Sequence, residues 1–212
     1  MLREFCAENL AGVREAIEAG AQRVELCDDL SAGGITPSDA VIKGAVKAIH
    51  ALGAAVMVMV RPRGGGFAYG EEELACMVRT IVLARTLGAD GVVFGCVREG
   101  KLDLPSTRRL VDAANGLDMT FHMAFDEIDP RLQLESLGLL VDLGFSRVLT
   151  HGGSLSLPIE ECLPRLRTFV DAARGRISIM PGGGVTWENA ESVALALGVH
   201  EVHGTRIVRM PV

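Results

Sequence analysis

Short runs of apolar and β-branched residues alternate with longer helical patterns along the chain. Because parallel strands that are covered on both faces appear as short apolar runs, this alternation predicts strands separated by helices. The predicted strands are Leu2–Cys6, Arg23–Cys27, Ala55–Val60, Gly91–Phe94, Met119–His122, Arg147–Leu149, Ile177–Met180 and Glu201–His203. The predicted helices are roughly Asn9–Ala19, Ser38–Leu52, Glu71–Leu87, Pro105–Asn115, Pro130–Leu143, Ile159–Ala173 and Trp187–Leu197.

Glycine follows most of these predicted helices, just before the next strand. A left-handed residue at that position stops a helix, and glycine adopts this conformation without a steric penalty. Capping residues and prolines mark several helix starts, at Thr36-Pro37-Ser38, Asp129-Pro130 and Thr186. The glycines that end helices are Gly20, Gly53, Gly88, Gly144, Gly175 and Gly198.

Eight strands connected in this way predict an α/β fold, a TIM-type (β/α)8 barrel that forms a single domain over residues 1–212. Right-handed crossovers repeat without a reversal point, which favours a closed barrel over the alternative, a doubly wound open sheet. After the eighth strand only residues 204–212 remain, too few for the final covering helix. Either the chain is truncated or a partner subunit covers the seam between the last and first strands. A large apolar patch left at that seam would favour association, so we predict a homo-oligomer.

Composition narrows the classes of partner and the compartment. Apolar residues make up 49% of the chain and aromatic residues 4%, so Ala, Val, Leu and Ile must build the core. The net charge of -6, without a Lys/Arg cluster, opposes binding to nucleic acid. The charged N-terminus and the short longest apolar run, Ala54–Val60, predict neither a signal peptide nor a membrane span. Five cysteines without a CxxC pair indicate free thiols and a cytoplasmic location.

The first two strands carry acidic and sulfur-containing residues on one face. Glu4 and Cys6 share a face of the first strand, and Glu25 and Cys27 share a face of the second, because side chains alternate along a strand. Buried carboxylates need partners, so we expect Glu4 and Glu25 to be paired. The two sulfurs lie on neighbouring strands and can converge on one soft ion such as Cu(I), although buried cysteines also occur as ordinary core residues. Three further cysteines are interpreted as structural: Cys76, Cys96 and Cys162.

Two glycine-rich loops are candidate anion sites. Arg61 and Arg63 begin the loop after the third strand, and they can either bind a carboxylate or phosphate or form a structural network with Glu4 and Glu25. Gly182, Gly183 and Gly184 follow the seventh strand, where barrels often bind phosphate, although such a loop can also be a simple tight turn.

Three histidines follow predicted strands. His122 ends the fifth strand, with Asp126 on the loop beyond it, and can serve as a general base, a metal ligand or a hydrogen-bonded structural residue. His203 ends the eighth strand with weaker support for a functional role, and His151 follows the sixth. Function in a barrel concentrates at these strand ends, which makes all three candidates.

A set of motifs in fixed order now points to a known family. The motifs are Val24-Glu25-Leu26-Cys27, Gly33-Gly34-Ile35-Thr36-Pro37-Ser38, Arg61-Pro62-Arg63-Gly64-Gly65, Phe121-His122, Ala124-Phe125-Asp126, Arg147-Val148-Leu149-Thr150 and Glu201-Val202-His203. In this joint pattern the chain resembles the CutC family, named for copper homeostasis, over nearly its whole length. The resemblance implies a TIM-type barrel, oligomers, a cytoplasmic location and copper binding, with Cys6 and Cys27 matching the suggested Cu(I) ligands.

The sequence departs from the usual family pattern at two positions and at its end. Met123 stands where an arginine is usual, and His151 stands where a small residue is usual. The first change weakens the expectation of an anionic substrate, and the second adds a candidate metal ligand. The C-terminal extension that is usual in the family is missing.

Two functional hypotheses follow. In the first, Cys6 and Cys27 bind Cu(I), with His122 as a candidate third ligand, in a protein of copper homeostasis. In the second, an uncharacterised barrel enzyme acts on a small anionic metabolite, held by Arg61, Arg63 and the Gly182–Gly184 loop. His122, with Asp126 or Glu25, would then transfer protons.

Overall fold

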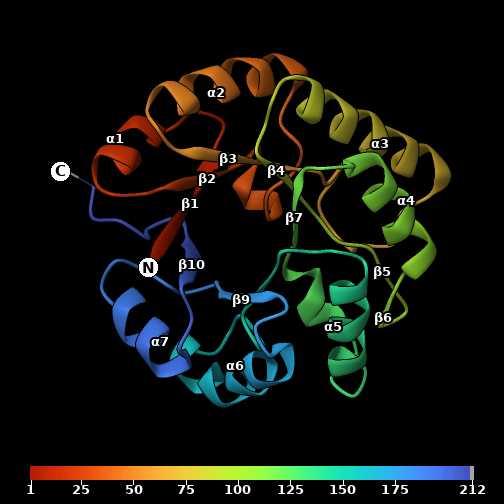
Figure 1. Cartoon of the computed structure of the whole chain (residues 1–212), viewed down its shortest axis with the longest axis vertical. Helices are drawn as coiled ribbons and strands as arrows, with labels where there is room; N and C mark the ends of the chain where they lie inside the picture. The colour runs from red at the N-terminus through yellow and green to blue at the C-terminus, as the bar shows by residue number, and fades with distance from the viewer. Residues whose placement is uncertain (211–212) are drawn as a thin grey trace.

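The computed structural model describes residues 1–210, and within them eight parallel strands form a nearly closed barrel (Figure 1). The strands follow one another around the barrel in the order β10-β1-β2-β3-β4-β7-β8-β9. Because neighbours in the ring follow chain order, the predicted TIM-type barrel is confirmed and the doubly wound sheet is wrong. The bounds are β1 (Leu2–Glu8), β2 (Arg23–Cys27), β3 (Ala55–Met59), β4 (Gly91–Phe94), β7 (Asp118–Phe121), β8 (Arg147–Thr150), β9 (Ser178–Pro181) and β10 (Glu201–Gly204).

The barrel closes by pairing the last strand with the first. Leu2 of β1 lies opposite Glu201 of β10, and Phe5 lies opposite Gly204. β9 and β10 stand at the two ends of the strand order. The segments that follow them are joined by a hydrogen bond, in which the Trp187 N–H donates to the Arg206 carbonyl at 2.8 Å. The ring therefore brings the first and last strands side by side.

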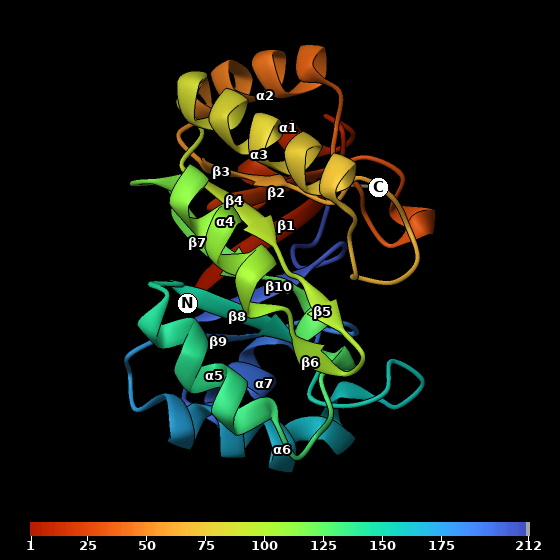
Figure 2. The same ribbon diagram turned by 90° about the vertical axis from the view of Figure 1, so that its right-hand side faces the viewer.

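The helices cover the outside of the barrel (Figures 1 and 2). Each predicted helix-ending glycine has a positive φ, between 69° and 107°, which confirms its role as a left-handed stop. The helices within the described part of the chain are α1 (Val13–Glu18), α2 (Asp39–Ala51), α3 (Glu71–Thr86), α4 (Leu104–Ala114), α5 (Gln133–Asp142), α6 (Ile159–Ala173) and α7 (Ala190–Leu197).

Three helices begin later than the sequence predicts. Before α1, Asn9 and Gly12 adopt left-handed conformations, with φ of 52° and 66°, so the helix starts only at Val13. α5 begins at Gln133 and α7 at Ala190, each after a turn that follows the expected cap. The loops also contain short elements too small to produce a periodic pattern: η1 (Leu30–Ala32), η2 (Met123–Glu127) and the hairpin of β5 (Val97–Arg98) and β6 (Lys101–Leu102).

The two faces of the strands build different cores, as the alternation predicts. Val24, Leu26 and Val58 belong to the large aliphatic core between the strands and the helices. A separate buried cluster fills part of the barrel interior and consists of Cys6, Cys27, Met57, Met59 and Val93. The barrel interior is therefore rich in sulfur, where TIM barrels usually contain branched aliphatic residues.

After β10 the described chain, to residue 210, contains no further helix, as expected. Ile207 and Val208 are buried, and Met210 lies against the loop that contains Gly12, beside α1. Arg209 stacks on Trp187 at 5.1 Å, so this tail lies between α1 and the start of α7. It covers part of the seam, and the homo-oligomer stays a prediction.

Among the helices within residues 1–210, none has both the length and the apolar character needed to span a lipid bilayer.

Candidate functional site

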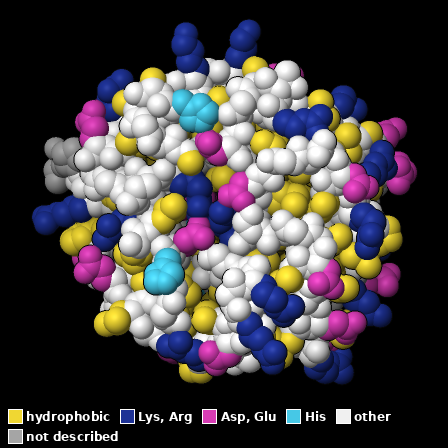
Figure 3. Space-filling model, in the orientation of Figure 1, with side chains coloured by type: hydrophobic (Ala, Val, Ile, Leu, Met, Phe, Trp, Pro, Cys, Tyr) yellow, Lys and Arg dark blue, Asp and Glu magenta, His cyan; other side chains and the backbone are white. Residues whose placement is uncertain are grey.

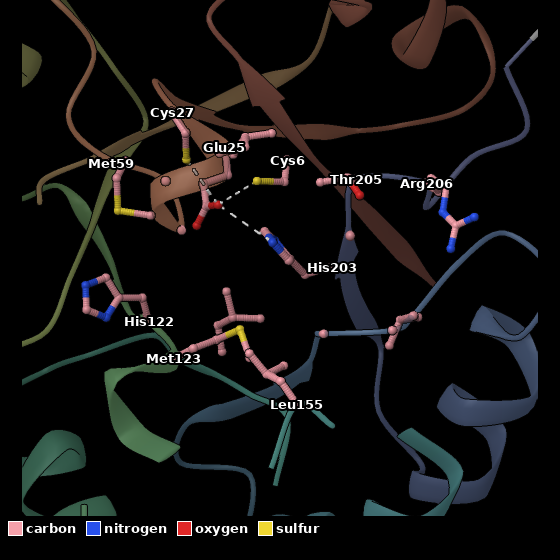
Figure 4. A pocket seen from close by; sticks show the side chains of 18 of the residues that line it. Cys6, Glu25, Cys27, Met59, His122, Met123, Leu155, His203, Thr205 and Arg206 are labelled. Atoms are coloured by element: carbon pink, nitrogen blue, oxygen red, sulfur yellow. Dashed lines mark hydrogen bonds and ion pairs between the residues drawn. The ribbon is translucent and has the colours of Figure 1, made fainter. Parts of the chain in front are cut away.

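A cavity of about 300 Å³ opens at the C-terminal ends of the strands. Its floor carries thiol, carboxyl and imidazole groups from β1, β2 and β10, and its walls are largely apolar (Figure 4). This is the end of a barrel at which functional residues gather. The residues that line it include Cys6, Glu25, Cys27, Met59, Arg61, Phe67, His122, Met123, Leu155, Gly183, Gly184, His203, Thr205 and Arg206.

Glu25 is the centre of the cavity floor. The thiol of Cys6 lies 3.2 Å from its Oε2 and the thiol of Cys27 lies 3.5 Å from the same oxygen. Nε2 of His203 is 3.7 Å from Oε2 on a third side. The strand register explains the arrangement, because Cys6 lies directly opposite Glu25 and Cys27 follows two residues later on the same face. Within residues 1–210 the other oxygen, Oε1, has no hydrogen-bond partner although it is buried.

A column of paired charges continues from this floor toward the other end of the barrel. Nδ1 of His203 lies 2.8 Å from Oε1 of Glu4, and Arg23 donates to the other oxygen of Glu4. Arg23 also donates to Glu201 at 2.5 Å. Arg147 extends the column by contacting Glu201 at 3.2 Å, and it forms a further ion pair with Asp118 at 2.5 Å.

The column reaches the surface at the N-terminal ends of the strands. Figure 3 shows side chains of both charges at the centre of that face. Burying so many charges is tolerated because each is paired with an opposite charge. The column fixes the positions of Glu4 and His203, and through His203 it supports Glu25.

The surroundings shift the ionisation of these groups in different directions. Burial by itself raises the pKa of Glu4, but Arg23 and His203 outweigh it and lower the pKa to about 2. Burial raises the pKa of Glu25 well above its usual range. For His203, burial opposes the charged form, yet the acidic groups beside it raise its pKa well above 6.5. The site therefore combines a buried cation with a carboxyl that resists ionisation.

The pKa values of the two thiols also shift in opposite directions. A hydrogen bond from Cys27 lowers the pKa of Cys6 well below 9.0, with His203 acting in the same direction. That bond, together with burial, raises the pKa of Cys27. Cys6 is the thiol that ionises first, because its negative charge is stabilised by a donor and by a neighbouring cation.

Arg61 and Arg63 do not form the expected network with Glu4 and Glu25; that interpretation is wrong. Arg23 and His203 occupy this role because they lie on strands, at the level of the carboxylates, whereas Arg61 follows the end of β3. Arg61 donates to four backbone carbonyls at 2.8–3.1 Å, which belong to Ala32, Gly33, Gly34 and Gly65. Arg63 pairs with Glu73 at 2.6 Å.

His122 reaches the cavity, as predicted, but its surroundings restrict the tautomer and the protonation of its ring. Its Nδ1 accepts a hydrogen bond from the Ala124 N–H at 3.2 Å, which leaves the proton on Nε2. Burial, with a contribution from Arg61, lowers the pKa of His122 to about 3. A neutral imidazole whose free nitrogen carries a proton is a hydrogen-bond donor and a poor metal ligand. The ring packs on Phe67 with 4.9 Å between the centroids.

Asp126 and His151 lie together outside the main cavity. Asp126 accepts from the Thr150 hydroxyl at 2.5 Å and from the backbone N–H groups of His151 and Gly152. His151 directs its Nδ1 at the Gly183 carbonyl, 2.7 Å away. Both side chains thus hold the loops after β8 and β9 in place, and Asp126 is engaged in these bonds rather than aimed at Glu25.

The glycine loop after β9 forms part of the cavity wall. Gly183 and Gly184 line the cavity with positive φ of 73° and 94°, conformations that favour glycine. Gly182 lacks space for a side chain, since a Cβ there would lie 2.5 Å from Leu149 and 3.3 Å from His203. Leu155, which is 67% exposed, covers Gly183 from the loop before α6.

Sequence reasoning missed Arg23 as the partner of Glu4 and missed Met59 in the cavity wall. Both could have been found from alternation, because Arg23 shares a face with Glu25 and Met59 lies on the interior face of β3. It also gave His203 too little weight, since its proximity to Glu4 depends on the pairing of β10 with β1.

These features define a class of protein: a TIM-type barrel with two thiols and a buried carboxyl at the floor of its C-terminal cavity. The sequence matches the CutC family over residues 1–208, and the chain belongs to that family. The CutC family protein of Enterococcus faecalis is 44% identical over 98% of this chain and 100% of its own length.

A human relative and a solved structure extend the similarity. The copper homeostasis protein cutC homolog of Homo sapiens is 40% identical over 95% of this chain and 72% of its own length. A crystal structure of CutC from Streptococcus agalactiae is 45% identical, has a TM-score of 0.95 and covers 98% of this chain and 100% of that one.

Proposed function

We propose that this protein acts in copper homeostasis in the cytoplasm and binds one Cu(I) ion between Cys6 and Cys27. The observation that carries the proposal is the convergence of both thiols on Glu25, with the three potential ligand atoms within 4.8 Å of one another. A metal bound by two thiolates at about 2.3 Å each needs sulfurs no more than about 4.6 Å apart. Soft thiolates select Cu(I), so the donor set fits this ion. The copper homeostasis name of the human relative supports the same role.

The strand register favours a metal site over a redox disulfide. Cys6 lies opposite Glu25 and Cys27 lies opposite Glu8, so the two cysteines are staggered by two residues. With strands about 4.8 Å apart and about 3.3 Å per residue, the Cα atoms are about 8 Å apart. A disulfide requires Cα atoms closer than about 7 Å. The thiols can therefore share an ion without forming a bond to each other.

The protonation of the site also suits metal binding. Thiols release protons when they bind a metal, and the lowered pKa of Cys6 makes that release easier. Glu25, whose raised pKa favours its protonated form, lies within 3.5 Å of both sulfurs, where its carboxyl can donate a hydrogen bond to a thiolate.

An anaerobic Cu(I) titration against a competing chelator tests the proposal. We expect one Cu(I) per chain in the wild type and a large loss of affinity in Cys6→Ser and in Cys27→Ser. Cys76→Ser is the matched control, because Cys76 lies in α3, outside the cavity, and should leave binding unchanged. Unchanged affinity in both cavity variants would refute the proposal.

A second candidate function is catalysis on a small anionic metabolite. It is favoured by three buried polar atoms of residues that line the cavity, Oε1 of Glu25, Nε of Arg61 and Nε2 of His122, which lack hydrogen-bond partners in the part of the chain the structure describes. A copper site formed by two cysteines uses none of them. Because both terminal nitrogens of Arg61 already bond to loop carbonyls, an anion would be held mainly by Gly183, Gly184 and the rim residue Arg206.

Calorimetric titration with inorganic phosphate and with small carboxylates tests this alternative. Binding that is lost in Arg206→Gln and retained in Cys27→Ser would support it. Heats no larger than those of dilution for every anion would count against it.

A further inference from the structure

A third sulfur lies beside the proposed copper site. Met59 is buried, with 4% of its surface exposed, and it lines the same cavity as Cys6 and Cys27. These residues share one small interior cluster, which is separate from the aliphatic core of the barrel. Its composition calls for explanation, because the interior of a TIM barrel is normally filled with Val, Ile and Leu.

The strand register places Met59 next to Cys27. In the ladder between β2 and β3, Glu25 lies opposite Met57 and Leu26 lies opposite Val58. The next pair in the same register is Cys27 and Met59, on the face that points into the barrel. Neighbouring parallel strands are about 4.8 Å apart, which is close enough for both side chains to reach one ion. Figure 4 shows the Met59 side chain reaching into the cavity between Cys27 and His122.

We infer that the thioether sulfur of Met59 is the third ligand of Cu(I), which completes a three-sulfur site with the thiolates of Cys6 and Cys27. This inference rests on the proposed copper function and specifies its coordination. Thioethers are soft ligands and suit Cu(I). Three rotatable bonds allow the sulfur to adjust to the ion, and its binding displaces no proton.

The other nearby side chains fit this role less well. The free nitrogen of His122 carries a proton, because its Nδ1 accepts from the Ala124 N–H. Met57, two residues before Met59 on the same face, has its sulfur directed at Gly91, where a Cβ would lie 2.7 Å from it. Met57 is also outside the cavity lining. It therefore provides a matched control of the same residue type on the same strand.

The test uses the full chain labelled with selenomethionine and loaded anaerobically with Cu(I). X-ray absorption at the copper edge should show two sulfur neighbours and one selenium neighbour in the wild type and in Met57→Leu. In Met59→Leu the selenium neighbour should disappear, and the affinity for Cu(I) should fall roughly tenfold, in the range typical for lost support of a metal ligand. Leucine has a similar volume, so circular dichroism should show the same fold.

The outcomes separate the two proposals. If copper binding depends on both cysteines but lacks a selenium neighbour, and Met59→Leu binds as tightly as the wild type, the third ligand is wrong and the copper function stands. Binding that does not depend on either cysteine overturns both. If the selenium neighbour is lost in Met57→Leu and kept in Met59→Leu, the ligand is Met57, and the inference is overturned.

Discussion

Replacing Arg61 with Gln tests whether this buried arginine is a structural clamp or an anion ligand. Its guanidinium makes four hydrogen bonds to carbonyls of the loops after β2 and β3, at 2.8–3.1 Å. Glutamine can replace about one of them. Three of the carbonyls share the two N–H groups of Nη1, so three N–H groups are engaged and the variant loses about two. Hydrogen bonds from a charged donor contribute about 1.5 kcal/mol or more each, so the fold should be destabilised by about 3 kcal/mol. An anion ligand without a structural role would cost little stability when removed.

The matched control is Arg63→Gln, two residues further along the same loop. Arg63 also contacts backbone carbonyls and pairs with Glu73, but its side chain is 43% exposed. Water can replace these contacts, so the expected loss is within about 1 kcal/mol. Urea unfolding at pH 7, followed by circular dichroism, measures both variants. Equal stabilities of Arg61→Gln and Arg63→Gln would refute the clamp.

The same substitution should also disturb the thiol site. Arg61 donates to the Gly34 carbonyl at 3.1 Å. Gly34 lies against Cys27, since a Cβ added to this glycine would be only 3.2 Å from the Cys27 sulfur. Loosening this loop removes the backbone that covers Cys27. We therefore expect Arg61→Gln to weaken Cu(I) binding, although Arg61 donates no ligand. If the variant folds only partly, Arg61→Lys gives an intermediate test, because a lysine retains the charge without the forked geometry.

Three further predictions concern stability. His122→Gln should remove a pH dependence: the unfolded chain takes up a proton near pH 6.5 and the folded chain only near pH 3. The wild type should therefore lose about 1.4 kcal/mol per pH unit, relative to the variant, as the pH falls between these values. Glu4→Gln should abolish a loss of about 3 kcal/mol that the wild type shows as the pH falls from about 5 to 2, because the pKa of Glu4 drops from 4.5 to about 2 on folding. Parallel curves for variant and wild type in urea titrations across these ranges would contradict either prediction. Gly91→Ala should cost about 1–3 kcal/mol, because a Cβ would overlap the Asp118 carbonyl and the end of Met57. Gly44→Ala, in open space within α2, should instead stabilise the chain by about 0.5–1 kcal/mol, and thermal unfolding that shifts in the same direction for both would disprove this account.

Alternation along the strands predicted much of the candidate site. It placed Cys6 and Cys27 on interior faces of neighbouring strands, and the structure brings both to Glu25. It failed for Arg61, because alternation applies to strands and Arg61 lies beyond the end of β3, where its side chain follows the loops. The assignment of His122 to the cavity was right, but its tautomer depends on the Ala124 N–H, which only η2 brings into range.

The sequence by itself determined the local elements of this barrel. Apolar runs and helix-ending glycines depend on neighbouring residues, so the strand β2 and the helix α6 match their predicted bounds. The partners of buried charges depend instead on distant segments. Glu4 and His203 are 199 residues apart in the chain, and they meet because β10 closes the ring against β1. That closure also lines up the charges below Glu25, since a carboxylate is stable inside a barrel only where the complete fold supplies its counter-charge.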